Sequence, residues 1–125
     1  MQEGKVIIVD TSSMIFGIRN GIDIFDVLMS NFPGYKIIIS KGILRELDGF
    51  SKSTRQISKY ARLVLARISS SGITVDSDSG YADSWILRIA PEYSAIVCTN
   101  DIALKRKLEA NGVKVLSISR KGLLR

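Results

Sequence analysis

Unbroken apolar runs, rather than alternating ones, mark the expected strands of this chain. Residues 6–9 are Val-Ile-Ile-Val, a pattern typical of strands buried on both faces of a parallel sheet. Comparable runs lie at residues 35–39, 73–75, 95–98 and 113–118. Between them, apolar residues recur at helical spacing and predict helices over residues 14–19, 22–31, 40–50, 55–70, 81–90 and 102–111, with Pro91 ending the fifth. This alternation predicts one α/β domain over residues 1–125, a three-layer α/β/α sandwich around a mostly parallel sheet of about five strands.

Two acids follow predicted strands directly. Asp10 comes after the run at residues 6–9, and Asp101 follows the run at residues 95–98 through a Thr-Asn pair. Open parallel sheets bind their ligands beyond the carboxyl ends of the strands, so we expect a carboxylate site at this edge. The structural alternatives are a turn for Asp10 and a helix cap for Asp101.

Two more acids interrupt the apolar stripes of predicted helices. Glu46 falls within the stripe of residues 43, 47 and 50, whereas Asp48 points away, and Asp83 shares a face with residues 86, 87 and 90. A carboxylate among core-facing residues costs several kcal/mol unless it is paired or binds a metal. Glu46 and Asp83 are therefore expected at the carboxylate site, with an arginine partner as the alternative for Glu46. Asp23 and Asp26 open a helix and are expected to be structural.

Carboxylates gathered in one place need a compensating charge. Two of them ~5 Å apart repel each other by roughly 3 kcal/mol at an effective dielectric constant near 20. Either some of them take up protons, with raised pKa values, or a divalent cation neutralises them. The chain has no histidine and a single cysteine, Cys98, in an apolar run, which nearly excludes zinc sites and Ser-His triads. Mg²⁺ or Mn²⁺ suits oxygen ligands, and either ion can activate water and stabilise the charge on a phosphodiester.

The remainder of the chain is basic. Lys and Arg number 18 against 12 acidic residues, for a net charge of +6, which suits a polyanionic partner, nucleic acid first. A merely basic protein is the alternative, as an ordinary solvated face is for the row of basic residues that begins with Arg55 and Lys59. The candidate nucleic-acid contacts are Lys41, Arg45, Arg55, Lys59, Lys105 and Arg106. The expected reaction class is metal-assisted hydrolysis of nucleic acid.

Four short motifs, in this order, resemble those of the PIN-domain ribonucleases across nearly the whole chain. They are VDTSS at residues 9–13, ILREL at 43–47, YADSWIL at 81–87 and TNDIALKRKL at 99–108, followed by GVKVL at 112–116. The third and fourth motifs are most similar to the branch that contains eukaryotic small-subunit rRNA-processing nucleases and their short archaeal relatives.

The resemblance implies roles for individual residues. The positions that match the family's catalytic, metal-binding acids are Asp10, Glu46, Asp83 and Asp101. Ser12 and Thr99 match the hydroxyl residues that flank these acids. Ser84 stands where the rRNA-processing branch often has a further acid, which leaves open whether one metal or two are bound. Ser12 replaces an asparagine that is frequent in that branch.

The implied function is a Mg²⁺- or Mn²⁺-dependent endoribonuclease that cleaves single-stranded RNA. Its implied partners are a pre-ribosomal particle in rRNA processing or, since the family includes toxins, an antitoxin protein; a homodimer is also implied. A catalytically silent RNA-binding domain is a further alternative. A phosphorylatable receiver domain is disfavoured because Ser40, not an acid, follows the run at residues 35–39.

The location is expected to be cytoplasmic. No apolar run approaches the ~20 residues of a membrane helix, so no membrane association is expected. Residues 1–5 do not have the shape of a signal peptide.

Overall fold

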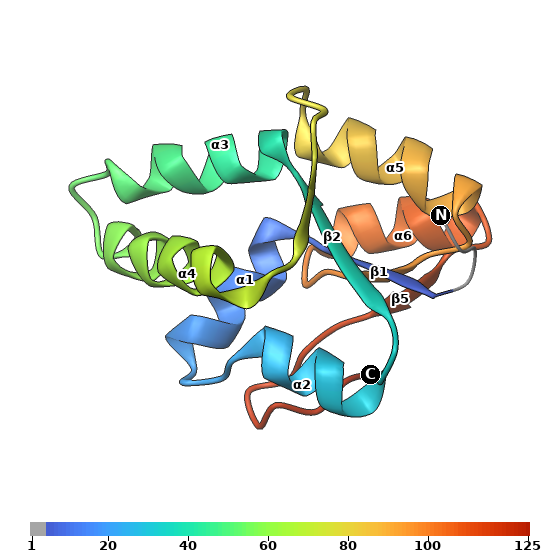
Figure 1. Cartoon of the computed structure of the whole chain (residues 1–125), viewed down its shortest axis with the longest axis horizontal. Coiled ribbons are helices and arrows are strands. Elements are labelled where there is room, and N and C mark those ends of the chain that lie inside the picture. Colours follow the sequence, from blue (N-terminus) through green and yellow to red (C-terminus); the bar gives the residue numbers. More distant parts are fainter. Residues whose placement is uncertain (1–4) are drawn as a thin grey trace.

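A parallel sheet forms the centre of the protein, in a computed structural model that describes residues 5–125. Within these residues its strands are β1 (Val6–Val9), β2 (Lys36–Ser40), β3 (Thr74–Asp76), β4 (Ile96–Cys98) and β5 (Lys114–Leu116). Their spatial order is β3-β2-β1-β4-β5 (Figure 1), and every neighbouring pair is parallel. The chain runs outward from β1 in both directions, so the carboxyl ends of β1 and β4 form the switch point where such sheets bind ligands.

Helices connect all the strands. They are α1 (Thr11–Arg19), α2 (Ile24–Asn31), α3 (Lys41–Ser51), α4 (Ile57–Ser71), α5 (Ala82–Glu92) and α6 (Ile102–Ala110). Right-handed crossovers place α1 to α4 on one face of the sheet and α5 and α6 on the other. The contacts agree, since α4 packs on α1 and α3, and α5 packs on α6. The predicted three-layer α/β/α sandwich is confirmed. None of the helices in residues 5–125 combines the length and apolar character needed to span a membrane.

The predicted end of the fifth helix is wrong. Pro91 lies inside the last turn of α5, which continues to Glu92. Proline removes one hydrogen bond from a helix, and Pro91 is exposed, so water can solvate the carbonyl left without a partner. The amide of Tyr93, two residues further on, still donates to the carbonyl of Ile89 at 3.1 Å.

The last strand is shorter than residues 113–118, and the basic segment that follows it folds back. β5 pairs with β4, which ends at Cys98, so no neighbour remains for β5 beyond Leu116. Ser117 and Arg125 instead exchange two backbone hydrogen bonds, of 3.0 and 2.9 Å. These bonds fix the basic end of the chain against the residues that follow β5.

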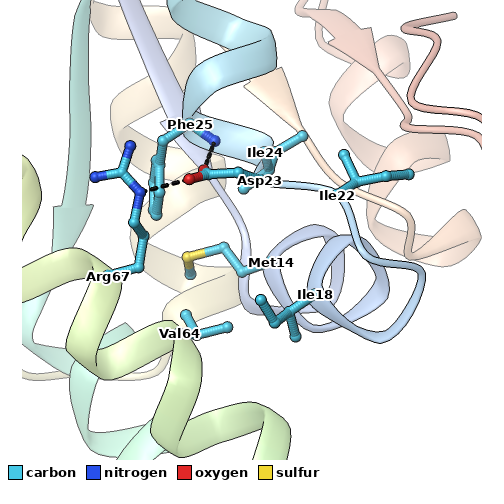
Figure 2. A pocket seen from close by; sticks show the side chains of 8 residues that line it. All are labelled: Met14, Ile18, Ile22, Asp23, Ile24, Phe25, Val64 and Arg67. Atoms are coloured by element: carbon cyan, nitrogen blue, oxygen red, sulfur yellow. Dashed lines mark hydrogen bonds and ion pairs between the residues drawn. The ribbon is translucent and has the colours of Figure 1, made fainter.

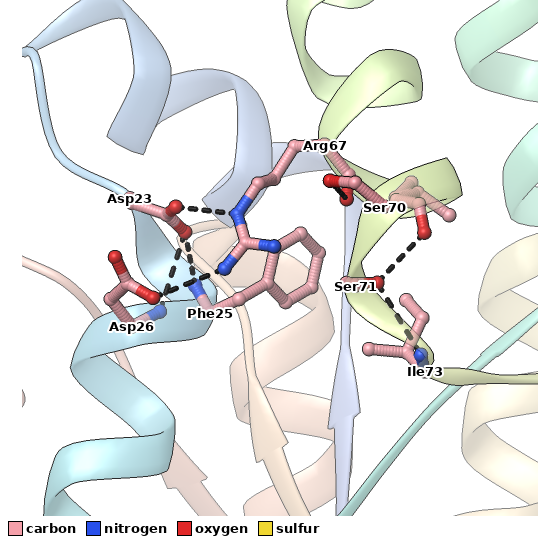
Figure 3. A network of polar contacts seen from close by, with 8 residues as sticks. Asp23, Phe25, Asp26, Arg67, Ser70, Ser71 and Ile73 are labelled. Atoms are coloured by element: carbon pink, nitrogen blue, oxygen red, sulfur yellow. Dashed lines mark hydrogen bonds and ion pairs between the residues drawn. The ribbon is translucent and has the colours of Figure 1, made fainter.

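An ion pair joins α2 to α4. Asp23 caps α2 by accepting hydrogen bonds from the amides of Phe25 (3.0 Å) and Asp26 (3.3 Å), and its Oδ2 accepts from Arg67 Nε (Figure 3). This pairing raises the pKa of Arg67, whose guanidinium lies 5.6 Å from the centre of the Phe25 ring. A small cavity of about 80 Å³ beside the pair is otherwise lined by apolar side chains (Figure 2). The structural role expected for both acids fits these contacts.

Replacing Asp23 with alanine should lower the free energy of unfolding by about 1–3 kcal/mol, because a helix cap and the main partner of Arg67 are lost together. Asp26→Ala is the matched control, since its side chain is 71% exposed and exposed ion pairs contribute at most about 1 kcal/mol. Urea denaturation measures both variants. Equal losses in the two would contradict the assigned role of the cap.

Candidate active site

Asp10 lies at the carboxyl end of the central strand. Its amide donates to the carbonyl of Cys98 at 2.9 Å, which extends the pairing of β1 with β4 by one residue. The side chain is only 4% exposed. Its Oδ2 accepts hydrogen bonds from the hydroxyls of Ser12 and Thr99, both at 2.8 Å. Its Oδ1 accepts none from the described residues 5–125, and so it is available to a ligand.

The same two hydroxyls connect the ends of β1 and β4. Ser12 Oγ and Thr99 Oγ1 lie 3.1 Å apart. Ser12 Oγ accepts from the amide of Asn100 and Thr99 Oγ1 accepts from the amide of Asp101, each at 3.1 Å. Asp101 caps α6 through Oδ1, which accepts from the amide of Leu104 at 3.1 Å. The cap foreseen for Asp101 is therefore present, and the same residue also lines the cleft described next.

The four acids of the predicted site line one cleft. Its volume is ≈ 540 Å³, and its lining residues are Asp10, Thr11, Ser12, Ile15, Phe16, Arg19, Glu46, Phe50, Ile57, Asp83, Asn100 and Asp101. Asp10 and Asp101 come from strand ends, whereas Glu46 and Asp83 come from α3 and α5, which contact each other and lie end to end in Figure 1. Residues far apart in the sequence are thus brought together at the switch point of the sheet.

Glu46 and Asp83 are more exposed than their apolar stripes predict. Both side chains are solvent-exposed at the rim of the cleft and are not enclosed in the core. The apolar stripes correctly predict the face of each helix on which these side chains lie. At the carboxyl edge of the sheet, however, this part of α3 and α5 is open to water. Within residues 5–125, no ion pair joins an arginine to Glu46.

Partial burial and mutual repulsion together raise the pKa values of two acids in the cleft. Partial burial raises the pKa of Glu46, and the nearby Thr11 hydroxyl opposes this, while the charges of Asp10 and Asp83 raise it further. The pKa of Asp83 is raised by partial burial and then by the charges of Asp10 and Asp101, against a smaller opposing effect of Lys107. The charge of Asp10 therefore contributes to the raised pKa of both Glu46 and Asp83.

The donor set fits a hard divalent cation bound in an open manner. Across residues 5–125, no three His, Cys, Asp or Glu side chains are grouped closely enough to enclose an ion. Mg²⁺ does not require such a cage, because it usually keeps several waters and binds one or two carboxylates together with substrate phosphate. Thr11 also lines the cleft, and its buried Oγ1 has no hydrogen-bond partner among residues 5–125.

The predicted nucleic-acid contacts lie outside the acidic cleft. Lys41, Arg45, Arg55, Lys59 and Arg106 are exposed, Lys105 is half-buried, and Arg45 lines an adjoining groove. The cation that lines the cleft itself is Arg19, which the sequence analysis missed. The sequence could have indicated Arg19, because Arg19 lies on the same face of α1 as Phe16 and the predicted site residue Ser12.

The loop before α5 is fixed to α3 by a close backbone approach. The amide of Gly42 donates to the carbonyl of Asp78 at 3.1 Å, and a Cβ at position 42 would collide with the carbonyl oxygen of Gly80. Asp78 Oδ1 accepts from the amide of Gly80 at 2.9 Å, and its Oδ2 accepts from Arg88 at 2.7 Å. Because residue 42 has no side chain, the loop can pack closely against α3. This packing fixes the position from which α5, with Asp83, begins.

Gly42→Ala should destabilise the protein by about 1–3 kcal/mol, because the loop must move away from α3 to make room. Gly49→Ala in the same helix is the matched control, since no atom lies within 4 Å of the added Cβ. That variant should gain about 0.5–1 kcal/mol from the reduced entropy of the unfolded chain. Denaturation midpoints that shift in the same direction for both variants would contradict this packing.

The raised pKa of Glu46 predicts the direction in which the stability of the protein changes with pH. A carboxyl group whose pKa is higher in the folded protein costs stability when it ionises, so this cost appears as pH rises and is absent below the ordinary value of 4.5. In EDTA, Glu46→Gln should therefore raise the melting temperature at pH 7–8, with the gain disappearing near pH 4. The control is Asp48→Asn, which removes only an exposed ion pair with Lys52 at 3.0 Å. A lower melting temperature of Glu46→Gln at neutral pH would contradict the repulsion.

The fold and cleft define a class of protein, and the sequence comparison agrees with it. The sequence pattern of the family described as the PIN-like domain matches residues 7–121. The chain belongs to this family, the PIN-domain ribonucleases, as its motifs predict.

Individual relatives cover most of the chain. Ribonuclease VapC4 of Methanocaldococcus jannaschii is 32% identical over 120 residues, which include 92% of this chain and 91% of that protein. Ribonuclease VapC9 of Archaeoglobus fulgidus is 28% identical over 108 residues, 86% of this chain and 78% of that protein. The structure of the PIN domain endonuclease Utp24 superimposes with a TM-score of 0.71 at 24% identity, covering 91% of this chain and 85% of that one. This last similarity supports the fold.

Proposed function

We propose that this chain is an endoribonuclease that hydrolyses single-stranded RNA with the help of Mg²⁺ or Mn²⁺. The observation that carries the proposal is the meeting of Asp10, Glu46, Asp83 and Asp101 in one cleft at the switch point of the sheet. Membership of the PIN-like domain family, with relatives named ribonucleases, supports RNA as the substrate.

The cleft acids would hold the ion through their carboxylate oxygens. Asp10 offers its free Oδ1, Asp101 has one oxygen outside its helix cap, and Glu46 and Asp83 stand at the rim. When bound, a divalent cation supplies Lewis acidity that activates water and stabilises charge on the scissile phosphodiester. Neutralisation of the acids also removes the repulsion that raises the pKa values of Glu46 and Asp83.

Side chains around the acids position the Asp10 carboxylate and the RNA strand. The hydroxyls of Ser12 and Thr99 hold Oδ2 of Asp10 in place, which fixes the direction of Oδ1 before substrate arrives. Arg19 lines the cleft and Arg45 lines the groove beside it, and both would contact phosphates of the strand. The basic residues outside the cleft, such as Arg55 and Lys59, add to the attraction of the polyanion.

A cleavage assay tests this proposal. The purified protein should cut a 5′-labelled single-stranded RNA in Mg²⁺ or Mn²⁺, lose this activity in EDTA, and regain it when the metal is restored. A DNA oligonucleotide of the same sequence is the substrate control. Binding of RNA without any product in either metal would instead favour the catalytically silent RNA-binding alternative.

The family resemblance offers two biological roles for such a ribonuclease. The third and fourth motifs support processing of rRNA within a pre-ribosomal particle. The greater sequence identity to ribonucleases VapC4 and VapC9 than to Utp24 favours the second role, a toxin ribonuclease held by an antitoxin protein. Crosslinking followed by sequencing of the recovered RNA separates them, since pre-rRNA should dominate in the first role. A homodimer and a cytoplasmic location stay predictions.

A further inference from the structure

Tyr81 is the most exposed of the large hydrophobic side chains in residues 5–125, at 86%. It is the N-cap residue of α5 and lies two positions before Asp83. Single exposed apolar residues are common on protein surfaces and need no explanation by themselves. The surroundings of Tyr81 distinguish it, because this residue is among those that line a groove.

The groove has a volume of ≈ 380 Å³ and adjoins the acidic cleft at Glu46. Its lining residues are Gly42, Arg45, Glu46, Ser79, Gly80, Tyr81 and Ala82. Glu46 also lines the cleft, so the two depressions share a wall. The groove therefore lies directly beside the cleft, within reach of an RNA strand bound there.

The backbone that carries the ring is held firmly. The loop is joined to α3 through the Gly42–Asp78 hydrogen bond and the close approach of Gly80 to Gly42. The amide of Trp85 donates to the carbonyl of Tyr81 at 3.1 Å, in the first turn of α5. The base of the side chain is thus fixed, while the ring has its surface free for a ligand.

We propose that the Tyr81 ring stacks on a nucleobase of the RNA strand beside the cleavage site, while Arg45 contacts a neighbouring phosphate. The proposal rests on the endoribonuclease function above. A flat aromatic face, a cation within the same groove and a shared wall with the carboxylate cleft are the three features that single-stranded RNA needs together. Stacking is tolerant of sequence, so the groove selects an unpaired base more than a particular base.

Charge favours RNA over a protein segment as the occupant. The acidic cleft repels phosphates, so a strand must be held by groups at the rim, and Arg45 supplies a cation there. The chain as a whole carries a net charge of +6, which attracts the same polyanion. RNA must reach the carboxylates of the cleft, whereas a protein segment in the groove would not need to lie beside them.

The test measures binding of single-stranded RNA to protein that carries Asp10→Asn, which blocks cleavage. Fluorescence anisotropy in Mg²⁺ should show roughly five- to 150-fold weaker binding for Tyr81→Ala, the range found for loss of base stacking. Tyr81→Phe should bind within about twofold of the parent, whereas Tyr81→Leu should stay weak because it keeps apolar area without an aromatic face. Met29→Ala, at an exposed apolar residue of α2 that does not line the groove, is the control.

Two further readouts identify the contacts. RNA with 2-aminopurine at successive positions should show quenching at one position near the cleavage site, and Tyr81→Ala should remove that quenching. Arg45→Ala should reduce the slope of log K against log salt by about 0.7, the value for one phosphate contact on a single strand. Lys114→Ala, at the start of β5, should leave the slope unchanged.

The outcomes separate this proposal from the function on which it rests. If wild-type protein cleaves RNA but Tyr81→Ala binds as tightly as the parent, the stacking site is wrong and the endoribonuclease function stands. If Tyr81→Leu binds as well as Tyr81→Phe, the contact is apolar and stacking is again wrong. If wild-type protein neither binds nor cleaves RNA, both proposals fall. The melting temperature of each variant shows that the fold is retained.

Discussion

Asp10→Asn is expected to reduce kcat/KM for RNA cleavage by at least about 100-fold, equivalent to ~3 kcal/mol of lost transition-state stabilisation. The reason is the loss of one charge at the most buried of the four cleft acids. The amide oxygen of asparagine can still accept the hydrogen bonds of Ser12 and Thr99, so the local structure should be kept. The melting temperature should therefore change little while activity is lost.

The control for this variant is an acid outside the cleft. Asp48→Asn removes the same charge from α3, where the side chain is exposed and pairs with Lys52. Its cleavage rate should stay within about twofold of wild type, because exposed pairs contribute at most about 1 kcal/mol even to stability. Asp10→Asn that cleaves RNA at the wild-type rate, in a preparation free of contaminating nuclease, would refute the catalytic role of the cleft.

Mn²⁺ is expected to stabilise the folded protein strongly. At a free concentration 100 times the Kd, binding to the folded state alone adds about 2.7 kcal/mol to the free energy of unfolding. The raised pKa values of Glu46 and Asp83 give the physical reason, since the cation removes repulsion that the metal-free cleft must bear. Thermal unfolding followed across a Mn²⁺ titration measures the effect.

The ligand-deficient control is Asp10→Asn combined with Asp101→Asn. This double variant should show little stabilisation by Mn²⁺, whereas Asp23→Asn, whose acid joins α2 to α4, should retain the full effect. NaCl at matched ionic strength corrects for general screening. Equal stabilisation of wild type and the double variant would place the ion elsewhere on the protein.

The fold follows from the sequence because its signals are local. An uninterrupted run such as Val6–Val9 identifies a buried parallel strand, and alternation with helical patterns leaves few topologies. The positions of Asp10 and Asp101 follow from the same logic, because residues after neighbouring parallel strands meet at one edge. The short β5 was less predictable, since its length depends on where its partner β4 ends.

The details of the site depend on contacts that sequence spacing does not encode. The stripe of α3 gave the direction of Glu46, but not that the residue stands at an open rim where water reaches it. To predict Arg19 as a site residue, one would have to know that the last turn of α1 borders the same cleft. Tyr81 lies within the third motif, yet its exposure and its groove arise only when the loop packs against Gly42.

The main proposal is that the cleft lined by acids from four separate segments binds the catalytic metal. Its most direct test is the crystal structure of the protein soaked in Mn²⁺, with anomalous diffraction used to locate the metal. We predict a manganese peak in the cleft, coordinated by Asp10 and at least one more of its acids. A well-ordered cleft without manganese, in protein from a batch that cleaves RNA equally well in EDTA, would contradict it.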